Sequence, residues 1–431
     1  MMETLVAFGK TGLKLNLPDG PRYEILQAHS ANPIPNVAAA LGAALDAPIG
    51  SPSLSALAAG KKTAAISVCD ITRPAPNRLT LPPILDRLHA AGMKPEDITL
   101  CIATGLHREA TAAELDTILG PQIARLYPIF NHDAKRKSDH EFLGETTRGT
   151  PVWIAKPFLQ ADLHITLGFI EQHLMLGFSG GRKLIAPGLA AQETIKVIHS
   201  PRFMRESLAV EGSIDENPIH ADLLEIAALA HHDFMLDVTL TKSREISGIF
   251  AGNNVQAHAA GVDFMRRSSV EYVPDYVDAA ITSAAGFPLD LTLYQTVKGI
   301  TAVQHIVKPG GKILILSECS EGIGSPEFEE KVAGYKGAQS FLDDIKDSPV
   351  VPDQWQLEKL ALVALKHPLS FYMPGIDAAH MGALGAQCFP SVNAAVSDLL
   401  NGLPPNARIA ILPDGPYAYA RVEEASPALV S

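Results

Sequence analysis

The sequence predicts an α/β protein built from two doubly wound domains, in which parallel sheets carry helices on both faces. Apolar runs of strand length alternate with segments of helical periodicity along most of the chain. The chain has 431 residues, which is more than one hydrophobic core normally holds. Its 47% hydrophobic and 19% charged residues are typical of a globular protein with an ample core.

The first half of the chain shows this alternation most clearly. Each strand of 62–68, 98–103 and 163–167 is followed by a helix, at 82–92, 114–119 and 191–199 respectively. Asn217 and Pro218 predict the N-cap and first position of a further helix. The remaining expected elements are a strand pair at 4–8 and 12–17, helices at 36–45 and 255–267, and a strand at 236–240.

A domain boundary is expected near residues 268–276, where a polar segment leads into a new apolar run. We therefore predict an N-terminal α/β domain of residues 1–270, completed by 405–431, and a C-terminal α/β domain of residues 271–404. The second domain is expected to contain strands at 279–282 and 312–316 and helices at 353–366 and 392–401, and a strand at 407–413 follows it.

Composition excludes several classes of partner. A net charge of −12 argues against nucleic acid and anionic membrane surfaces, which require a basic face. No apolar run reaches the ~18 residues of a membrane span, and the first residues lack a secretion signal, so a cytoplasmic location is expected. The four cysteines form no C-x-x-C pair, which argues against a zinc knuckle or a disulfide framework.

Three predicted strand ends carry unusual polar residues. Asp70-Ile-Thr-Arg73-Pro follows the strand at 62–68, and Gly105-Leu-His107-Arg108 follows the strand at 98–103. The strand at 163–167 leads into a glycine-rich run, residues 168–188. Because ligands of open α/β sheets bind outside the carboxyl ends of the strands, we expect these loops to line one crevice.

The glycine-rich run contains Ser179-Gly180-Gly181-Arg182-Lys183. Backbone N–H groups, a hydroxyl and two cations are the chemistry of phosphate capture at a loop that enters a helix. The spacing is not that of a Walker A loop. Composition alone leaves phosphate binding and a plain glycine-rich turn about equally plausible.

Candidate catalytic residues come from the same loops. His107 and His173 could act as acid and base on opposite faces of one substrate carbon, as in a racemase or epimerase, or could bind a metal with His199 as third ligand. Arg73 suits a substrate carboxylate, and the alternative is a structural pair with Asp70.

Two further candidates come from the second predicted domain. Gln295 and Lys298 lie three residues apart in a predicted helix, so they project from one face. They could close onto a substrate carboxylate, or they could be solvated helix-surface residues.

Taken together, these motifs resemble the nickel-dependent lactate racemase family. The resemblance is carried, in order, by Asp70-Ile-Thr-Arg-Pro, Gly105-Leu-His-Arg108, Glu171-Gln-His173, the run from Ser179 to Gly188, His199, and the run from Asp290 to Lys298. It extends from about residue 60 to 330. It implies two α/β domains with the active site in the cleft between them.

The resemblance also implies a cofactor, a nickel-pincer nucleotide: pyridinium-3-thioamide-5-thiocarboxylic acid mononucleotide carrying nickel. Lys183 would tether it covalently and His199 would be the protein ligand of nickel. The other residues expected to bind the cofactor are Asp70, Ser179, Gly180, Gly181 and Arg182. Proteins of cofactor biosynthesis are the expected partners.

The activity implied is racemisation or epimerisation of a small 2-hydroxy carboxylic acid through a 2-keto acid. Hydride would pass to the cofactor while His107 or His173 takes the hydroxyl proton. Arg73, Gln295 and Lys298 would hold the carboxylate. Residues 370–375 are expected to supply an apolar wall in place of the family's tryptophan, and the sequence leaves open which 2-hydroxy acid is bound.

Two other functions stay open. A nicotinamide-dependent 2-hydroxyacid dehydrogenase is disfavoured, because no G-x-G-x-x-G with a following acidic residue stands at a strand-to-helix turn. A non-enzymatic carrier of the nickel cofactor would bind the cofactor without turnover.

Overall fold

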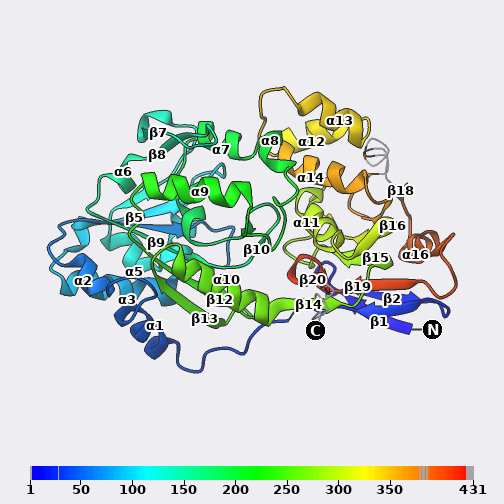
Figure 1. The fold of residues 1–431 in the computed structure, drawn as a ribbon, viewed down its shortest axis with the longest axis horizontal. Coiled ribbons are helices and arrows are strands. Elements are labelled where there is room, and N and C mark those ends of the chain that lie inside the picture. The colour runs from blue at the N-terminus through cyan, green and yellow to red at the C-terminus, as the bar shows by residue number, and fades with distance from the viewer. Residues whose placement is uncertain (1, 28, 378–379, 381–383, 385–386, 424–431) are drawn as a thin grey trace, which may run out of the picture. The chain divides into compact units, whose positions relative to one another are not determined.

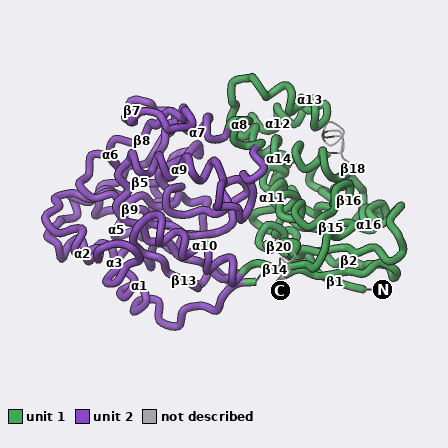
Figure 2. Tube along the Cα trace, viewed as in Figure 1, with its two compact units in different colours: residues 1–29, 200–205, 269–431 green, residues 30–199, 206–268 purple. Residues whose placement is uncertain are grey.

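The computed structural model describes residues 2–27, 29–377, 380, 384 and 387–423. The chain divides into two compact units, shown in different colours in Figure 2. Unit 1 contains residues 1–29, 200–205 and 269–431, and unit 2 contains residues 30–199 and 206–268. Each unit is built around its own six-stranded sheet.

The sheet of unit 2 has the strand order β13-β12-β9-β4-β5-β6. All neighbours are parallel except the edge pair β12 and β13. Its strands are β4 (Ala64–Cys69), β5 (Ile98–Ala103), β6 (Ile129–Asn131), β9 (Leu163–Phe169), β12 (Phe234–Leu240) and β13 (Ile246–Gly252). β4 and β9 are buried at every residue, as expected for central parallel strands covered on both faces.

Helices flank this sheet (Figure 1). They are α1 (Val37–Asp46), α2 (Leu54–Ala58), α3 (Asn77–Ala90), α4 (Ala112–Leu119), α5 (Pro121–Leu126), α6 (Lys156–Leu159), α7 (Gln192–Ile198), α9 (Pro218–Leu229) and α10 (Gln256–Ser269). The predicted cap of α9 is confirmed, because the Asn217 side chain accepts hydrogen bonds from the amides of Ile219 and His220, and Pro218 follows it.

Smaller elements of unit 2 form the loops around this sheet. Two are hairpins, β7 (His140–Glu145) with β8 (Pro151–Ala155), and β10 (Gln172–His173) with β11 (Gly177–Phe178). Three are short 3-10 helices, η1 (Pro95–Asp97), η2 (Lys137–Asp139) and η3 (Gly181–Leu184).

The sheet of unit 1 has the order β18-β17-β16-β15-β19-β3 and is parallel throughout. Its strands are β3 (Arg22–Ile25), β15 (Val277–Ser283), β16 (Val307–Leu316), β17 (Leu369–Tyr372), β18 (Gln387–Cys388) and β19 (Arg408–Leu412). The helices are α8 (Pro201–Met204), α11 (Leu293–Val303), α12 (Pro326–Ala333), α13 (Ala338–Ile345), α14 (Gln354–Ala364) and α16 (Val392–Leu400). The pairs β1 (Met2–Val6) with β2 (Leu13–Leu17), and β14 (Val270–Val273) with β20 (Tyr419–Val422), and the short helix η4 (Gly415–Tyr417) complete it.

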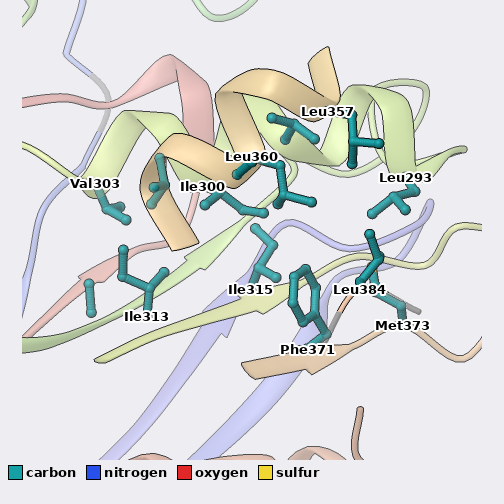
Figure 3. Packing of buried hydrophobic residues seen from close by; sticks show 14 of the residues in the cluster. Leu293, Ile300, Val303, Ile313, Ile315, Leu357, Leu360, Phe371, Met373 and Leu384 are labelled. Carbon is teal, nitrogen blue, oxygen red and sulfur yellow. The ribbon is translucent and has the colours of Figure 1, made fainter. Parts of the chain in front are cut away.

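One face of the unit 1 sheet packs against α11 and α14. Figure 3 shows Ile300 of α11 and Leu360 of α14 above Ile315 of β16 and Phe371 of β17, all at most 2% exposed. This apolar layer holds α11, and therefore Gln295 and Lys298, in place on the sheet.

The division into units differs from the predicted one at both ends of the chain. β3 pairs with β19, and β19 with β15, so residues near the N-terminus and after 405 belong to the sheet of unit 1. The prediction placed residues 1–29 and 405–431 with the first domain. Pairing between strands so distant in sequence leaves no local pattern, which explains the difference.

Among the residues described, none of the helices combines the length and apolar character that crossing a membrane requires.

Candidate functional site

The three loops with unusual polar residues lie at one edge of the unit 2 sheet, as predicted. β4 pairs in parallel with both β5 and β9, so the carboxyl ends of these three strands are adjacent. Two hydrogen bonds join the loops: the Gly105 amide donates to Gly188 O at 3.0 Å, and Ser67 Oγ donates to Leu184 O at 2.8 Å. The loops therefore form one site within unit 2.

Asp70 and His107 form a carboxylate–imidazole pair at this edge. His107 Nδ1 lies 2.7 Å from Asp70 Oδ2, and Thr72 Oγ1 donates to the other carboxylate oxygen at 2.6 Å. A carboxylate only accepts hydrogen bonds, so His107 Nδ1 carries the proton and Nε2 of the neutral ring keeps its lone pair. This assigns to Asp70 a hydrogen bond to His107, where the sequence predicted cofactor binding.

The charge state of Asp70 follows from its neighbours. Burial alone would raise its pKa, but the hydrogen bond and charge of His107, the Thr72 hydroxyl and the charge of Arg73 together lower the pKa. Asp70 is thus an anion at neutral pH. His107 has a side chain 51% exposed, whereas the Asp70 side chain is 7% exposed.

Arg73 is not paired with Asp70. Its guanidinium makes only 3.4 Å contacts to Thr72 O and Oγ1, and no carboxylate of the described residues lies within ion-pair distance of it. The structural alternative for Arg73 is therefore wrong, and its guanidinium remains a candidate to bind an anion.

His173 stands in the β10–β11 hairpin with different partners. Its Nδ1 accepts long hydrogen bonds from the amides of Met175 and Leu176, at 3.5 and 3.4 Å. The neutral ring then carries its proton on Nε2. His107 and His173 thus present opposite tautomers: a lone pair on Nε2 of the first and a proton on Nε2 of the second.

His199 ends helix α7 and is 6% exposed. Its Nδ1 lies 2.8 Å from Ile195 O, so Nδ1 donates and Nε2 keeps the lone pair. Burial lowers the pKa of His199 to about 4, the hydrogen bond to Ile195 opposes this, and the charge of Lys183 lowers the pKa further. His199 is therefore a neutral imidazole, the form that binds metals, and it lies within electrostatic reach of Lys183.

Several charges of the site act on one buried thiol, that of Cys69. Burial raises the pKa of Cys69 to about 12, the charges of Arg73 and Lys183 lower it, and those of Asp237 and Asp70 raise it. The charges of these four side chains therefore act together near the end of β4. The protonated thiol itself is inert.

The Ser179–Lys183 segment is arranged differently from the prediction. Ser179 Oγ donates to Phe169 O and accepts from the Glu171 amide, both at 2.9 Å, and the Gly181 amide donates to Asp237 Oδ2 at 2.7 Å. The Arg182 side chain is fully buried and donates to backbone carbonyls of the same loop. These groups are therefore used inside the protein rather than on a phosphate, and Lys183 is the partly exposed residue of the segment.

Gly180 has a steric role. Its φ of +88° is in the left-handed region, and a Cβ there would lie 2.2 Å from Asp237 Oδ2. Only glycine lets the loop approach this carboxylate.

The described part of the chain has no metal site made of protein side chains alone. No group of three His, Cys, Asp or Glu side chains able to hold a metal exists among the described residues, so His107, His173 and His199 do not form a metal triad. His199 can contribute one imidazole, and further ligands of a metal would have to come from a bound cofactor.

In unit 1, α11 carries Gln295 and Lys298 on its first turns, after Thr292 as N-cap. Both side chains are partly exposed. Gln295 Oε1 is buried without a hydrogen-bond partner in the described part of the chain. An unpaired buried amide oxygen is costly, so this side chain is suited to a ligand.

The expected apolar wall at residues 370–375 is wrong for Phe371 and Met373. Phe371 and Met373 are 0% and 1% exposed and belong to the core of unit 1. The neighbouring helix α14 contacts α11 beside Gln295, because the side-chain amide of Gln356 donates to Tyr294 O at 2.8 Å. The sequence did not predict this contact, since it joins two helices far apart in the chain.

Asp237 and His258 were also missed. Asp237 interrupts the apolar run of β12 and is 0% exposed, and burial raises its pKa to about 7 while the Gly181 amide and Arg182 lower it. The signal was available, because a charged residue inside a fully apolar strand needs a partner.

Comparisons with known proteins identify the family of this chain. Residues 8–212 match the family model of the lactate racemase N-terminal domain, and residues 273–417 match that of the lactate racemase C-terminal domain. The chain is 35% identical over 373 residues to lactate racemase of Thermoanaerobacterium thermosaccharolyticum, covering 85% of this chain and 87% of that one. It is 33% identical over 374 residues to lactate racemase of Lactiplantibacillus plantarum, covering 86% and 88%.

Solved structures give the same result. The lactate racemase apoprotein of T. thermosaccharolyticum matches with a TM-score of 0.89 and 31% identity, over 97% of this chain and 100% of that one. A protein of Thermotoga maritima is 17% identical and matches with a TM-score of 0.64, over 86% of this chain and 96% of that one, so it shares the fold. This chain belongs to the lactate racemase family and is, like its relatives, an isomerase of the racemase class.

Proposed function

We propose that this protein racemises or epimerises a small 2-hydroxy carboxylic acid, using a nickel-pincer nucleotide attached to Lys183. The observation that carries the proposal is the grouping of Lys183, a neutral His199 and the Asp70–His107 pair at one edge of the unit 2 sheet. The lactate named for the two relatives belongs to the proposed substrate class.

The residues present fit the proposed cofactor. His199 offers a lone pair on Nε2 from a ring held by Ile195 O, and the Lys183 amine acts electrostatically on that ring. When bound, the nickel group would accept the α-hydrogen of the substrate as hydride and return it. Proteins of cofactor biosynthesis would have to supply the group.

His107 is the proposed base for one enantiomer. Its Nε2 lone pair would take the proton of the substrate hydroxyl, and the Asp70 carboxylate would stabilise the imidazolium that results. His173 would donate to the oxygen of the keto acid in the same direction of reaction. For this step its ring must first take up a second proton, because a neutral ring that lost its Nε2 proton would become an imidazolate. In the reverse direction the two rings exchange roles.

Arg73, Gln295 and Lys298 are proposed to hold the substrate carboxylate. The Arg73 guanidinium has only weak contacts to Thr72, and it matches a carboxylate in shape and charge. The side-chain amide of Gln295 can offer either its oxygen or, after rotation, its NH2 group. Holding the carboxylate would let the planar keto acid turn over without leaving.

The test is a panel of enantiopure 2-hydroxy acids incubated with enzyme produced together with the cofactor-biosynthesis proteins. We expect one nickel per chain, a mass addition on Lys183, and loss of optical purity for at least one acid, followed by chiral chromatography. Loaded enzyme that leaves every acid unchanged would instead support a carrier of the cofactor. Consumption of NAD+ with formation of a keto acid would support a dehydrogenase.

A further inference from the structure

Arg182 is a fully buried arginine at the centre of the glycine-rich loop. Its Nη1 donates to Gly180 O at 3.2 Å and lies 2.7 Å from His258 Nε2, while Nη2 donates to Phe178 O at 3.0 Å. Longer contacts, each 3.4 Å, reach Ser179 O and Leu176 O. Four carbonyl groups of the segment 176–180 therefore converge on one guanidinium.

A nearby acidic side chain also stabilises this arrangement electrostatically. Asp237 is the acidic group that acts on Arg182, and it accepts the Gly181 amide of the same loop. Carbonyl oxygens and a carboxylate replace water around the buried cation, which lets a charge remain where desolvation would otherwise exclude it. His258, whose pKa burial holds well below its usual value, is neutral. Its Nε2 lies 2.7 Å from Arg182 Nη1 and 2.8 Å from Ser179 O, and one protonation state of this nitrogen can serve only one of the two contacts.

The loop continues directly into η3, where Arg182 and Lys183 are neighbours. In a 3-10 helix, successive side chains point about 120° apart, so the direction of one fixes that of the next. The end of η3 is held as well, because Ser67 Oγ donates to Leu184 O and the Gly188 amide donates to Lys183 O. Leu184 is buried, which leaves Lys183 as the partly exposed side chain between two anchored ones.

We propose that Arg182 is a positioning residue that binds the carbonyls of its own loop and, with Asp237, fixes the direction in which the Lys183 amine projects. This proposal depends on the proposed function only for the role of the Lys183 amine in binding the cofactor. The contacts of Arg182 with the loop carbonyls are present in the protein without cofactor.

The test measures the accessibility of Lys183 in the full chain without cofactor. An amine-acylating reagent is added in small amounts, and peptide mass spectrometry compares acylation of Lys183 with that of Lys94, whose side chain is 73% exposed. The variants are Arg182→Lys, which keeps the charge but cannot reach four carbonyls, and Arg182→Gln. We expect the Lys183 to Lys94 ratio to rise by about 3-fold or more in both, since the freed loop exposes the amine.

Arg87→Lys is the matched control. Arg87 also lies in unit 2 and also donates to two carbonyls, Pro83 O and Gly42 O, in addition to Asp46. An unchanged Lys183 ratio in Arg182→Lys, or an equal rise in Arg87→Lys, would overturn the proposal.

A milder variant covers the case in which Arg182 variants do not fold. His258→Gln removes the imidazole next to Arg182 and Ser179 O, and we expect a smaller rise of the same ratio. If the folded His258→Gln protein showed no rise in the Lys183 to Lys94 acylation ratio, this result would also contradict the positioning role of Arg182. Because acylation needs no nickel, a failure of the proposed function would appear separately, as wild-type protein that acquires no adduct on Lys183 when the cofactor is supplied.

Discussion

The two units have sheets of the same size but bury different chemistry. Unit 2 buries the guanidinium of Arg182, the carboxyl groups of Asp70 after β4 and Asp237 within β12, and several histidines whose pKa burial lowers, such as His132 and His199. Unit 1 also buries charged side chains, Asp290, Glu358 and Lys359, but His367 is the only buried histidine among its described residues, and its sheet face toward α11 and α14 is apolar. Similar topology therefore says little about where reactive groups lie, and the proton and cofactor chemistry proposed above would depend on the side chains of unit 2.

The first prediction separates two lysines, one from each unit. Lys183→Ala should abolish both the mass addition and racemisation, because it removes the only amine proposed to hold the cofactor. Lys298→Ala should keep the adduct and the nickel but lose turnover of the substrate. Intact mass, nickel analysis and chiral chromatography measure the three quantities. If Lys298→Ala lost the adduct as well, the proposal that the cofactor is held by unit 2 and the substrate by unit 1 would be contradicted.

The second prediction concerns the Asp70–His107 pair. Asp70→Asn should lower kcat/KM by about 10²–10³-fold, because an amide can donate to Nδ1 and so favour the tautomer without a lone pair on Nε2. Nickel content should stay unchanged. Thr72→Val removes only the hydroxyl bonded to the other oxygen of Asp70 and should cost far less. Equal losses in both variants would contradict the role of the carboxylate.

The third prediction tests the contribution of unit 1. Gln295→Ala should raise KM about 10-fold with a smaller change in kcat, as expected for a group that binds substrate without moving a proton. Gln304→Ala, at the opposite end of α11, is the control and should leave both constants unchanged. A loss confined to kcat would show that Gln295 acts in the chemical step instead.

The fourth prediction concerns stability against pH in unit 2. Burial lowers the pKa of His232 to about 4, so below pH ~6.5 the unfolded chain binds a proton that the folded chain does not. The free energy of unfolding should therefore fall as the pH drops from 7.5 to 5, by about 1–2 kcal/mol from His232 alone. His232→Asn should remove this share and make the pH dependence shallower in urea unfolding, while the other buried histidines of unit 2, such as His132 and His199, keep theirs.

Asp237 should act with the opposite sign. Its folded-state pKa of about 7 lies above that of an exposed carboxyl, so its contribution to stability is present at low pH and is lost as the pH rises through 7. Asp237→Asn should remove that loss. A variant with the slope of the wild type would show that the carboxyl is not buried as described.

The sequence predicted the parallel strands and the meeting of three loops, because apolar runs and polar strand ends are local signals. β5 has the predicted bounds, and Asn217 caps α9 as expected. The antiparallel edge strand β13 and the insertion of β3 beside β19 depend on distant pairing and could not be predicted. Arg182 illustrates a third limit, since an arginine among glycines indicates an exposed cation unless the inward carbonyls are known.

The unlike partners of His107 and His173 have a consequence for the time course of the reaction. Mirror-image molecules have equal free energy, so for a racemisation kcat/KM is the same in the two directions whatever surrounds the site. His107 has a carboxylate as its partner and His173 has backbone amides. If this difference makes kcat unequal in the two directions, KM must therefore differ between the directions by the same factor. In one direction both kcat and KM would be high, and in the other both would be low. Both directions would still end at an equal mixture of the two enantiomers.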